Sequence, residues 1–181
     1  DLTMKLKLKS APIALAGHLQ IVRRDANTQG ILDIWEKKNV ITYGAVESVV
    51  KLLAPNLLFG ATVQQENAIK SMRFGVSNLA PQRTDTSLSS EAIVSGNPVR
   101  IELLDANRNV GASGTVLFVA TLATSIGNGV TYREAGLYTR GLADDPLVTT
   151  GAILFAHQVF PDQIKTAAVE LEFRWRITFT V

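Results

Sequence analysis

A long run of alternating hydrophobic and polar residues extends from Val169 to Val181, at the carboxy-terminal end of the chain. Every second residue in it is hydrophobic, and Phe173, Trp175 and Ile177 lie near the middle of the hydrophobic set. Successive side chains of a strand point to opposite faces of a sheet, so this period predicts a strand with one buried and one solvated face. Because the strand is long, we expect it to be paired on both sides and covered by a second layer.

Two shorter alternating segments near the amino terminus, Leu19–Arg24 and Ile31–Glu36, predict a hairpin. The residues between them, Asp25–Gly30, are rich in the residue types that form turns. Further strands are predicted at Ala68–Val76, Glu91–Val94, Pro98–Leu104, Thr115–Ala123, Tyr132–Thr139 and Ala152–Phe160. The spacing of the turns favours about eight to ten antiparallel strands in a sandwich over alternating β-α units.

Several details of these strands follow from their side chains. In the strand Ala68–Val76, Met72 and Phe74 share one face, and Lys70 and Arg73 are expected outside it. Val119 gives its strand a second hydrophobic face, which predicts a place near the centre of a sheet. The strand that begins at Ala152 is expected to end at Pro161. The polar segments at residues 77–87 and 105–114 are predicted to be loops.

One segment has the clear period of a helix. Thr42 is a suitable N-cap for it, and Pro55 ends it. Hydrophobic residues between them form a stripe at Ala45, Val49, Leu52 and Leu53, which Val46 and Val50 widen. A single helix with such a stripe is expected to pack on a sheet. The predicted fold class is therefore mainly β, an antiparallel β-sandwich with one packed α-helix and an extended N-terminal arm.

The predicted arm comprises residues 1–16 and precedes a single β-rich structural domain at residues 17–181. Lysine and leucine alternate in it, at Lys5, Leu6, Lys7, Leu8 and Lys9. The segment Ser10–Gly17, which contains Pro12, is expected to separate the arm from the hairpin. Two interpretations stay open: an edge strand of the domain's own sheet, or an arm that pairs with a neighbouring subunit. The five alternating residues are therefore a candidate subunit interface.

Composition narrows the classes of function. The 181 residues suffice for one domain, and a hydrophobic fraction of 46% suffices to fill its core. The absence of cysteine excludes disulfides, thiolate metal sites and cysteine nucleophiles. A net charge of +2 does not indicate nucleic-acid binding, which needs clustered positive charge. No hydrophobic run reaches the roughly 18 residues that a membrane helix needs. We therefore expect no membrane and no specific nucleic acid as partners.

The titratable residues that could carry chemistry do not form a recognisable motif. His18 and His157 have no partner at the spacing of metal ligands, and Asp144 and Asp145 precede a proline, as in a turn. We expect these four residues and Glu134 not to converge on one pocket. Phosphate-binding glycine loops and nucleophile elbows are also absent from the sequence. The sequence therefore predicts a binding or structural protein that is not an enzyme and has no cofactor.

Three residues are candidates for structural roles instead: Glu134, Lys165 and Trp175. Glu134 follows Arg133, and one member of this pair is expected to point inward and hydrogen-bond to backbone, which would fix a loop. Lys165 lies between a proline turn and the last strand, where a structural or interface lysine is expected rather than a nucleophile.

Four stretches together carry a resemblance to a known family. They are Asn39–Val46, Met72–Leu88, Thr131–Tyr138, and the set Leu154-Phe-Ala, Lys165 and Trp175–Phe179. In this order and spacing they resemble a module of tailed-bacteriophage structural proteins, found at the attachment ends of tail fibres and in small stand-alone virion proteins. The chain departs from the family in having Phe155-Ala-His157 in place of Phe-Ala-Arg, and in its basic arm.

The resemblance implies a β-rich virion component that attaches other parts and has no catalytic residues. We therefore expect a non-enzymatic structural component of the virion, a tail, collar or baseplate protein that anchors fibres. Its expected partners are other virion proteins and further copies of itself. A capsid decoration protein is the first alternative, and a carbohydrate-binding module, which would need exposed aromatic side chains, is the second.

Overall fold

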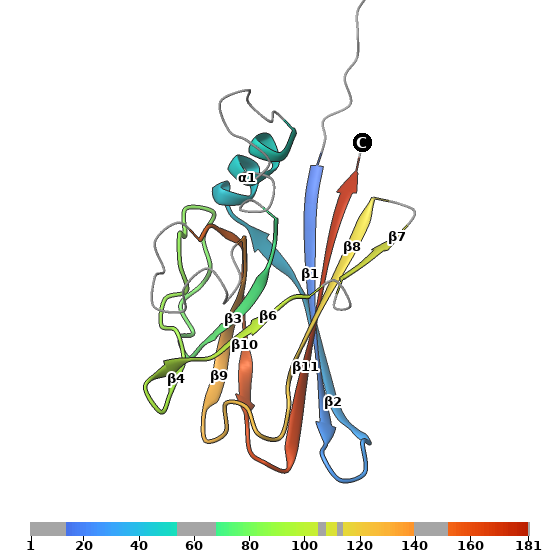
Figure 1. Ribbon diagram of the computed structural model, residues 1–181, viewed down its shortest axis with the longest axis vertical. Helices are drawn as coiled ribbons and strands as arrows, with labels where there is room; N and C mark the ends of the chain where they lie inside the picture. Colours follow the sequence, from blue (N-terminus) through green and yellow to red (C-terminus); the bar gives the residue numbers. More distant parts are fainter. Residues whose placement is uncertain (1–13, 54–67, 105–107, 112–113, 140–151, 181) are drawn as a thin grey trace, which may run out of the picture.

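The computed structural model describes residues 14–53, 68–104, 108–111, 114–139 and 152–180 (Figure 1). Its elements in chain order are β1 (Ala14–Asp25), β2 (Ile31–Ile41), α1 (Tyr43–Leu53), β3 (Ser71–Gly75), β4 (Ile93–Val94), β5 (Asn97–Pro98), β6 (Arg100–Glu102), β7 (Arg108–Gly111), β8 (Thr115–Leu122), β9 (Thr131–Tyr138), β10 (Leu154–Ile164) and β11 (Val169–Thr180). The fold is mainly β with one helix, as predicted. No helix in these ranges is long and hydrophobic enough to cross a membrane.

Nine of the described strands form one continuous antiparallel sheet, which divides at β2 into two parts called sheet A and sheet B here, and β4 and β5 form a separate two-stranded sheet. Sheet A has the order β2-β1-β11-β8-β7, and sheet B has the order β6-β3-β9-β10. The two sheets are joined where β10 pairs with the end of β2, at Val40 and Ile41. Figure 1 shows sheet A on the right and sheet B on the left, with α1 above sheet B. The predicted antiparallel sandwich is confirmed, and it is nearly closed.

The last strand, β11, lies between β1 and β8 and organises the core, as predicted. Phe173 and Trp175 are fully buried, and Ile177 nearly so. On the other face Arg174 is half-buried and Arg176 is exposed. The ring of Phe173 lies 4.7 Å from that of Phe74 in β3, so the two sheets meet through aromatic side chains.

The predicted hairpin is formed by β1 and β2, and its turn is stabilised by Asp25. The Asp25 carboxylate accepts hydrogen bonds from the backbone N–H groups of Asn27 and Thr28, at 3.0 and 2.8 Å. Asp25 carries a pKa below its usual value, chiefly because of the hydrogen bond from the Thr28 backbone.

The last three residues of the predicted N-terminal arm belong to strand β1. Strand β1 begins at Ala14, and Ala14–Ala16 pair with β11 opposite Thr178–Thr180. Gly17 lies inside β1 opposite Asn39, so it does not separate an arm from the hairpin. A side chain at this position would collide with the Asn39 side chain, which explains why the strand continues through a glycine. The candidate interface residues Lys5–Lys9 lie outside the described residues.

Helix α1 begins after Thr42 and packs against β10, but Thr42 does not cap it as predicted. Its hydroxyl instead donates to the carbonyl oxygens of Leu154 and Phe155 in β10. This contact fixes the start of the helix to sheet B. Ala45 is fully buried, whereas Val46 is 56% exposed, so Val46 does not widen the buried stripe.

Three strand predictions are corrected by the sheet topology. β10 continues through Pro161 to Ile164, because its pairing with β9 is interrupted between Val159 and Gln163, where a residue without an N–H is tolerated. β7 lies inside the segment 105–114, which was expected to be a loop. The strand of Val119, β8, is second from the edge of sheet A rather than central.

Arg73 is also corrected, since only 5% of it is exposed. Its guanidinium carbon lies 4.1 Å from the ring centroid of Tyr138, a cation–π contact. Burial, and then the neighbouring charge of Arg100, lower the pKa of Arg73. β3 is buried on both faces because the segment at residues 77–90, called the covering segment here, lies over its outer side. The alternation pattern carries no sign of that cover.

Candidate functional site

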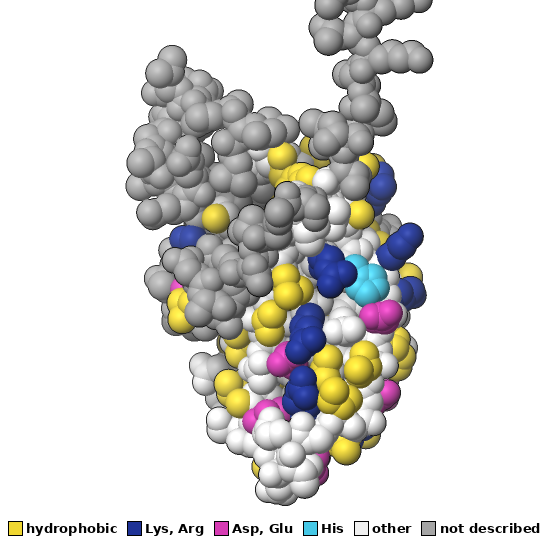
Figure 2. Space-filling view, turned by 90° about the vertical axis from the view of Figure 1, so that its right-hand side faces the viewer, with side chains coloured by type: hydrophobic (Ala, Val, Ile, Leu, Met, Phe, Trp, Pro, Cys, Tyr) yellow, Lys and Arg dark blue, Asp and Glu magenta, His cyan; other side chains and the backbone are white. Residues whose placement is uncertain are grey.

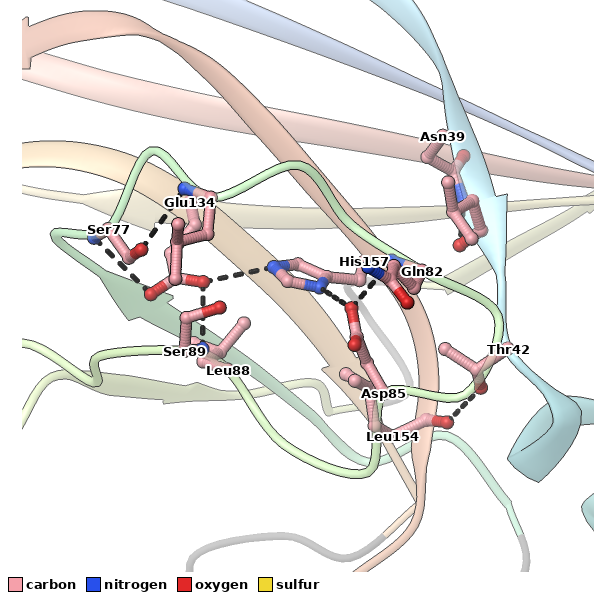
Figure 3. A network of polar contacts seen from close by, with 12 residues as sticks. Asn39, Thr42, Ser77, Gln82, Asp85, Leu88, Ser89, Glu134, Leu154 and His157 are labelled. Atoms are coloured by element: carbon pink, nitrogen blue, oxygen red, sulfur yellow. Dashed lines mark hydrogen bonds and ion pairs between the residues drawn. The ribbon is translucent and has the colours of Figure 1, made fainter.

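The candidate site is a line of three polar side chains on the outer face of sheet B. His157 in β10 lies between Glu134 in the adjacent strand β9 and Asp85 in the segment at residues 77–90 (Figure 3). Its Nε2 is 2.9 Å from a Glu134 carboxylate oxygen, and its Nδ1 is 2.8 Å from an Asp85 carboxylate oxygen. His157 and Glu134 are fully buried, and the Asp85 side chain is 26% exposed.

The Glu134 carboxylate binds backbone as well as His157. It accepts hydrogen bonds from the backbone N–H groups of Ser90 at 2.7 Å, Ser89 at 3.0 Å and Ser77 at 3.4 Å. Both ends of the covering segment are therefore fastened to β9 by one side chain. The sequence-based expectation that Glu134 or Arg133 would point inward and fix a loop is thus met by Glu134.

Asp85 fastens the middle of the same segment. Its carboxylate accepts the backbone N–H of Gln82 at 2.7 Å and also faces His157. A carboxylate oxygen only accepts hydrogen bonds when ionised, so a histidine between two carboxylates donates from both ring nitrogens. The arrangement therefore favours the imidazolium form of His157.

The charge of His157 has two opposing causes. Burial by itself lowers the pKa of His157. The hydrogen bonds to Glu134 and Asp85, together with the charges of these carboxylates, outweigh burial and place the pKa above the ordinary value.

Gly75, at the end of β3, permits this approach. A Cβ there would collide with the Glu134 carboxylate and with the carbonyl oxygen of Ser90. Position 75 therefore requires a glycine for a steric reason, because the Glu134 side chain and the covering segment pass close to it.

A second cluster lies under the same segment. Leu88, Tyr138 and Leu154 form a small buried hydrophobic group, and the Tyr138 hydroxyl accepts the backbone N–H of Leu88 at 2.8 Å. Burial raises the pKa of Tyr138 to about 12, so this hydroxyl stays protonated at neutral pH. Beside it, Arg100 forms a two-point ion pair with Glu91, at 2.6 and 2.9 Å.

Lys165 and Trp175 have structural positions, like Glu134. The Lys165 side chain is fully buried, and its ammonium donates to the Asn128 side chain at 2.7 Å and to the Thr166 carbonyl at 2.9 Å. Burial lowers the pKa of Lys165. The Trp175 indole N–H donates to the Asn39 side chain at 2.9 Å, which connects β11 to β2.

Of the five titratable residues that were expected not to converge on one pocket, the structure brings two into direct contact. His157 and Glu134 are bonded directly, whereas His18 lies on β1 in sheet A. Asp144 and Asp145 lie outside the described residues. Asp85, the third residue of the His157 site, was not predicted, because it lies in a segment rich in turn-forming residues.

The chemistry open to this site is limited by burial. His157 has no exposed surface with which to reach a ligand, and its two nitrogens are both occupied. Among the described residues, no group of three histidine or acidic side chains has the arrangement of a metal site. Of the three site residues, only Asp85 lines a hollow of about 410 Å³ between α1 and the covering segment. Other residues that line this hollow include Tyr43, Glu47, Arg83, Thr84 and Thr86.

Searches against protein-family models, curated proteins and solved structures found no match to this chain.

Proposed function

We propose that this protein is a non-enzymatic structural component of a tailed-phage virion, a tail, collar or baseplate protein that anchors fibres. The proposal starts from the four sequence stretches that resemble phage attachment modules. Its partners are other virion proteins and further copies of the chain, and a capsid decoration protein stays the alternative position within a virion.

One observation supports this proposal above the others. Three conspicuous residues of the resembling stretches, Glu134, Lys165 and Trp175, are buried and hydrogen-bonded within the domain. A catalytic group needs access to substrate, whereas these residues fix one strand or loop to another. They support a rigid module whose surface carries the function.

The position of the protein in a particle tests the proposal. Purified particles of the phage whose genome encodes this chain should contain it at a fixed copy number. A cryo-electron microscopy map of these particles should place the sandwich at the tail, collar or baseplate. Density on the capsid lattice would favour the decoration alternative. Absence of the chain from purified particles, with abundant chain in the infected cell, would contradict both.

A carbohydrate-binding role is a second candidate because of one exposed aromatic side chain. Tyr43 is 61% exposed and lines the hollow beside Arg83 and Glu47, and an exposed ring with polar neighbours is a surface on which a sugar can stack. A glycan array that shows binding by the wild type and none by Tyr43→Ala would support this role. No binding by the wild type would remove it.

A further inference from the structure

Strand β2 has a long edge that no other described strand covers. On one side it pairs with β1 from Ile31 to Asn39, and on the other it pairs with β10 only at Val40 and Ile41. Along the open part the side chains of Asp33, Glu36 and Lys37 are exposed. An open edge presents backbone N–H and C=O groups that another strand can bind.

The hydrogen bond of Ile34 shows which groups face the open side. Its backbone N–H donates to the carboxylate of Asp33 at 2.8 Å rather than to β1. In an antiparallel pair, alternate residues direct their backbone groups to the same neighbour, so Glu36 and Lys38 share the direction of Ile34. Asp33 therefore covers one N–H of an otherwise open edge.

Hydrophobic side chains are exposed beside this edge. Ile31, Leu32 and Ile34 are 55%, 53% and 49% exposed, all within four residues. Figure 2 looks onto the molecule from the side of sheet A and shows hydrophobic side chains exposed there among basic and acidic ones. The open backbone edge of β2 and these three exposed side chains thus lie next to one another.

We propose that this edge is an interface between two copies of the chain, in which their β2 strands pair antiparallel about a two-fold axis at Trp35. This register places Ile34 opposite Glu36 of the second copy, and Asp33 opposite Lys37 of the second copy. The Ile34 N–H then donates to the Glu36 carbonyl across the axis. The released Asp33 carboxylate pairs with Lys37, and symmetry makes two such ion pairs.

Charge selects this register over its neighbours. The adjacent registers with the same hydrogen-bonding direction put Asp33 opposite Trp35 or Asn39, and both lose the ion pair. In the proposed register the two Ile34 side chains are diagonal neighbours across the axis, a distance at which side chains still make contact. The exposed hydrophobic surface is thus partly covered by its own copy.

A second copy fits this edge better than an unrelated strand because the edge is self-complementary. Asp33 and Lys37 have opposite charges and lie at equal distances on either side of Trp35. An antiparallel copy of the same strand, centred on Trp35, therefore places each of them opposite its partner. The contact is isologous, so it closes after two copies and leaves no free β2 edge for further growth. This inference does not depend on the virion role.

Exchanged charges test the proposal on the full chain. The wild type should sediment as a dimer whose dissociation is measurable on dilution. Asp33→Lys and Lys37→Asp should each place like charges opposite one another twice, and each should weaken the dimer by about ten- to a hundredfold. An equimolar mixture of the two variants should form a heterodimer, since every introduced charge then faces an opposite charge on the other copy.

Lys38→Asp is the matched control, because Lys38 is exposed on the same strand but faces Leu32 in this register. Lys38→Asp alone should dimerise like the wild type. Mixed with Asp33→Lys it should form fewer heterodimers than Lys37→Asp does, because one of the two ion pairs is still replaced by like charges. Circular dichroism should show that all three variants are folded. The proposal would be overturned by a wild type that stays monomeric at several hundred micromolar, by Asp33→Lys or Lys37→Asp chains that dimerise like the wild type, or by a mixture of these two variants without heterodimers.

Discussion

At the scale of single residues, burial turns reactive side chains into structural ones. His157 lies between two carboxylates and Lys165 between two oxygen acceptors, and both side chains are without exposed surface. A buried charge is costly unless it is paired and hydrogen-bonded. The role of each residue therefore follows from its partners rather than from its type.

Replacing Trp175 by alanine should lower the free energy of unfolding by about 3–5 kcal/mol, the range for a buried large aromatic side chain. The residue is fully buried and also donates to Asn39. Urea denaturation measures the loss. The control is Arg176→Ala, because Arg176 is the next residue along β11 and points to its exposed face. This substitution should change stability by about 0.5 kcal/mol or less. Equal effects of the two substitutions would mean that the assigned register of β11 is wrong.

His157 should make the protein less stable as the solution becomes alkaline. Its pKa in the folded state is raised above the unfolded value of 6.5. The stabilisation by the imidazolium is therefore fully present below about pH 6.5 and is lost as the pH rises through the folded-state pKa. Urea midpoints measured from pH 5.5 to 9 should fall in the wild type.

The conservative variant His157→Gln should be less stable at pH 6 and should lose most of this slope. His18→Gln is the matched control, because the other histidine lies on sheet A and should leave the slope in place. A wild-type slope that His157→Gln does not reduce would assign the pH dependence to other groups.

At the scale of elements, one segment and one strand end depend on contacts from far along the chain. The covering segment at residues 77–90 has no regular strand, and the side chains of Glu134, His157 and Tyr138 hold it against sheet B. The start of β1 likewise depends on its pairing with the end of β11.

Glu134→Gln should destabilise the fold by about 3–5 kcal/mol, because it leaves a buried imidazolium without its charge partner. Amide hydrogen exchange at Ser89 and Ser90 should accelerate more than exchange in β11. Asp85→Asn is the comparison, and it should have a smaller effect because Asp85 is partly solvated. The ranking is contradicted if the Asp85 variant is the less stable of the two.

Two truncations separate the arm from strand β1. A chain that begins at Ala14 keeps every described pair of β1 with β11, whereas a chain that begins at Gly17 loses the pairs opposite Thr178–Thr180. The shorter chain should therefore have the lower thermal midpoint, by a few degrees per lost kilocalorie. Equal midpoints would show that Ala14–Ala16 add nothing to the domain. Loss of assembly in both truncations, with a folded domain, would support an intersubunit arm at Lys5–Lys9.

At the scale of the whole molecule, the two sheets are held together through aromatic contacts across the core. Phe74 of sheet B meets Phe173 of sheet A, and Phe160 of β10 lies 5.8 Å from Phe173. The ring centroids of Trp35, in β2, and Phe160 are 5.9 Å apart. These rings connect β2 and β10, the strands at which the two sheets join, with β11 of sheet A and β3 of sheet B.

A double-mutant cycle measures this connection. Phe74→Leu and Phe173→Leu should each destabilise the protein, and the coupling between them should be about 0.5–1.5 kcal/mol, the range for an aromatic pair. Denaturant unfolding of the four chains gives the value. Strictly additive losses would show that the rings do not interact directly.

The sequence alone determined the elements whose pattern is local. Period-two alternation specified β11, the β1–β2 hairpin and the buried set Phe173, Trp175 and Ile177, because one face of each strand meets the core and the other does not. Turn-forming residues likewise bounded the hairpin turn. An inward side chain that fixes a loop was also expected from the pair Arg133 and Glu134, although the sequence did not decide which of the two it would be.

Only the tertiary structure decided which distant residues share an environment. Arg73 is buried because a segment without strand pattern covers β3, and Thr42 donates to β10 because that strand passes the start of α1. His157 meets Asp85 across 72 positions of sequence, a contact that no local period encodes. Local sequence fixes the side-chain direction within a strand, whereas sheet order and loop cover depend on the packing of the whole chain.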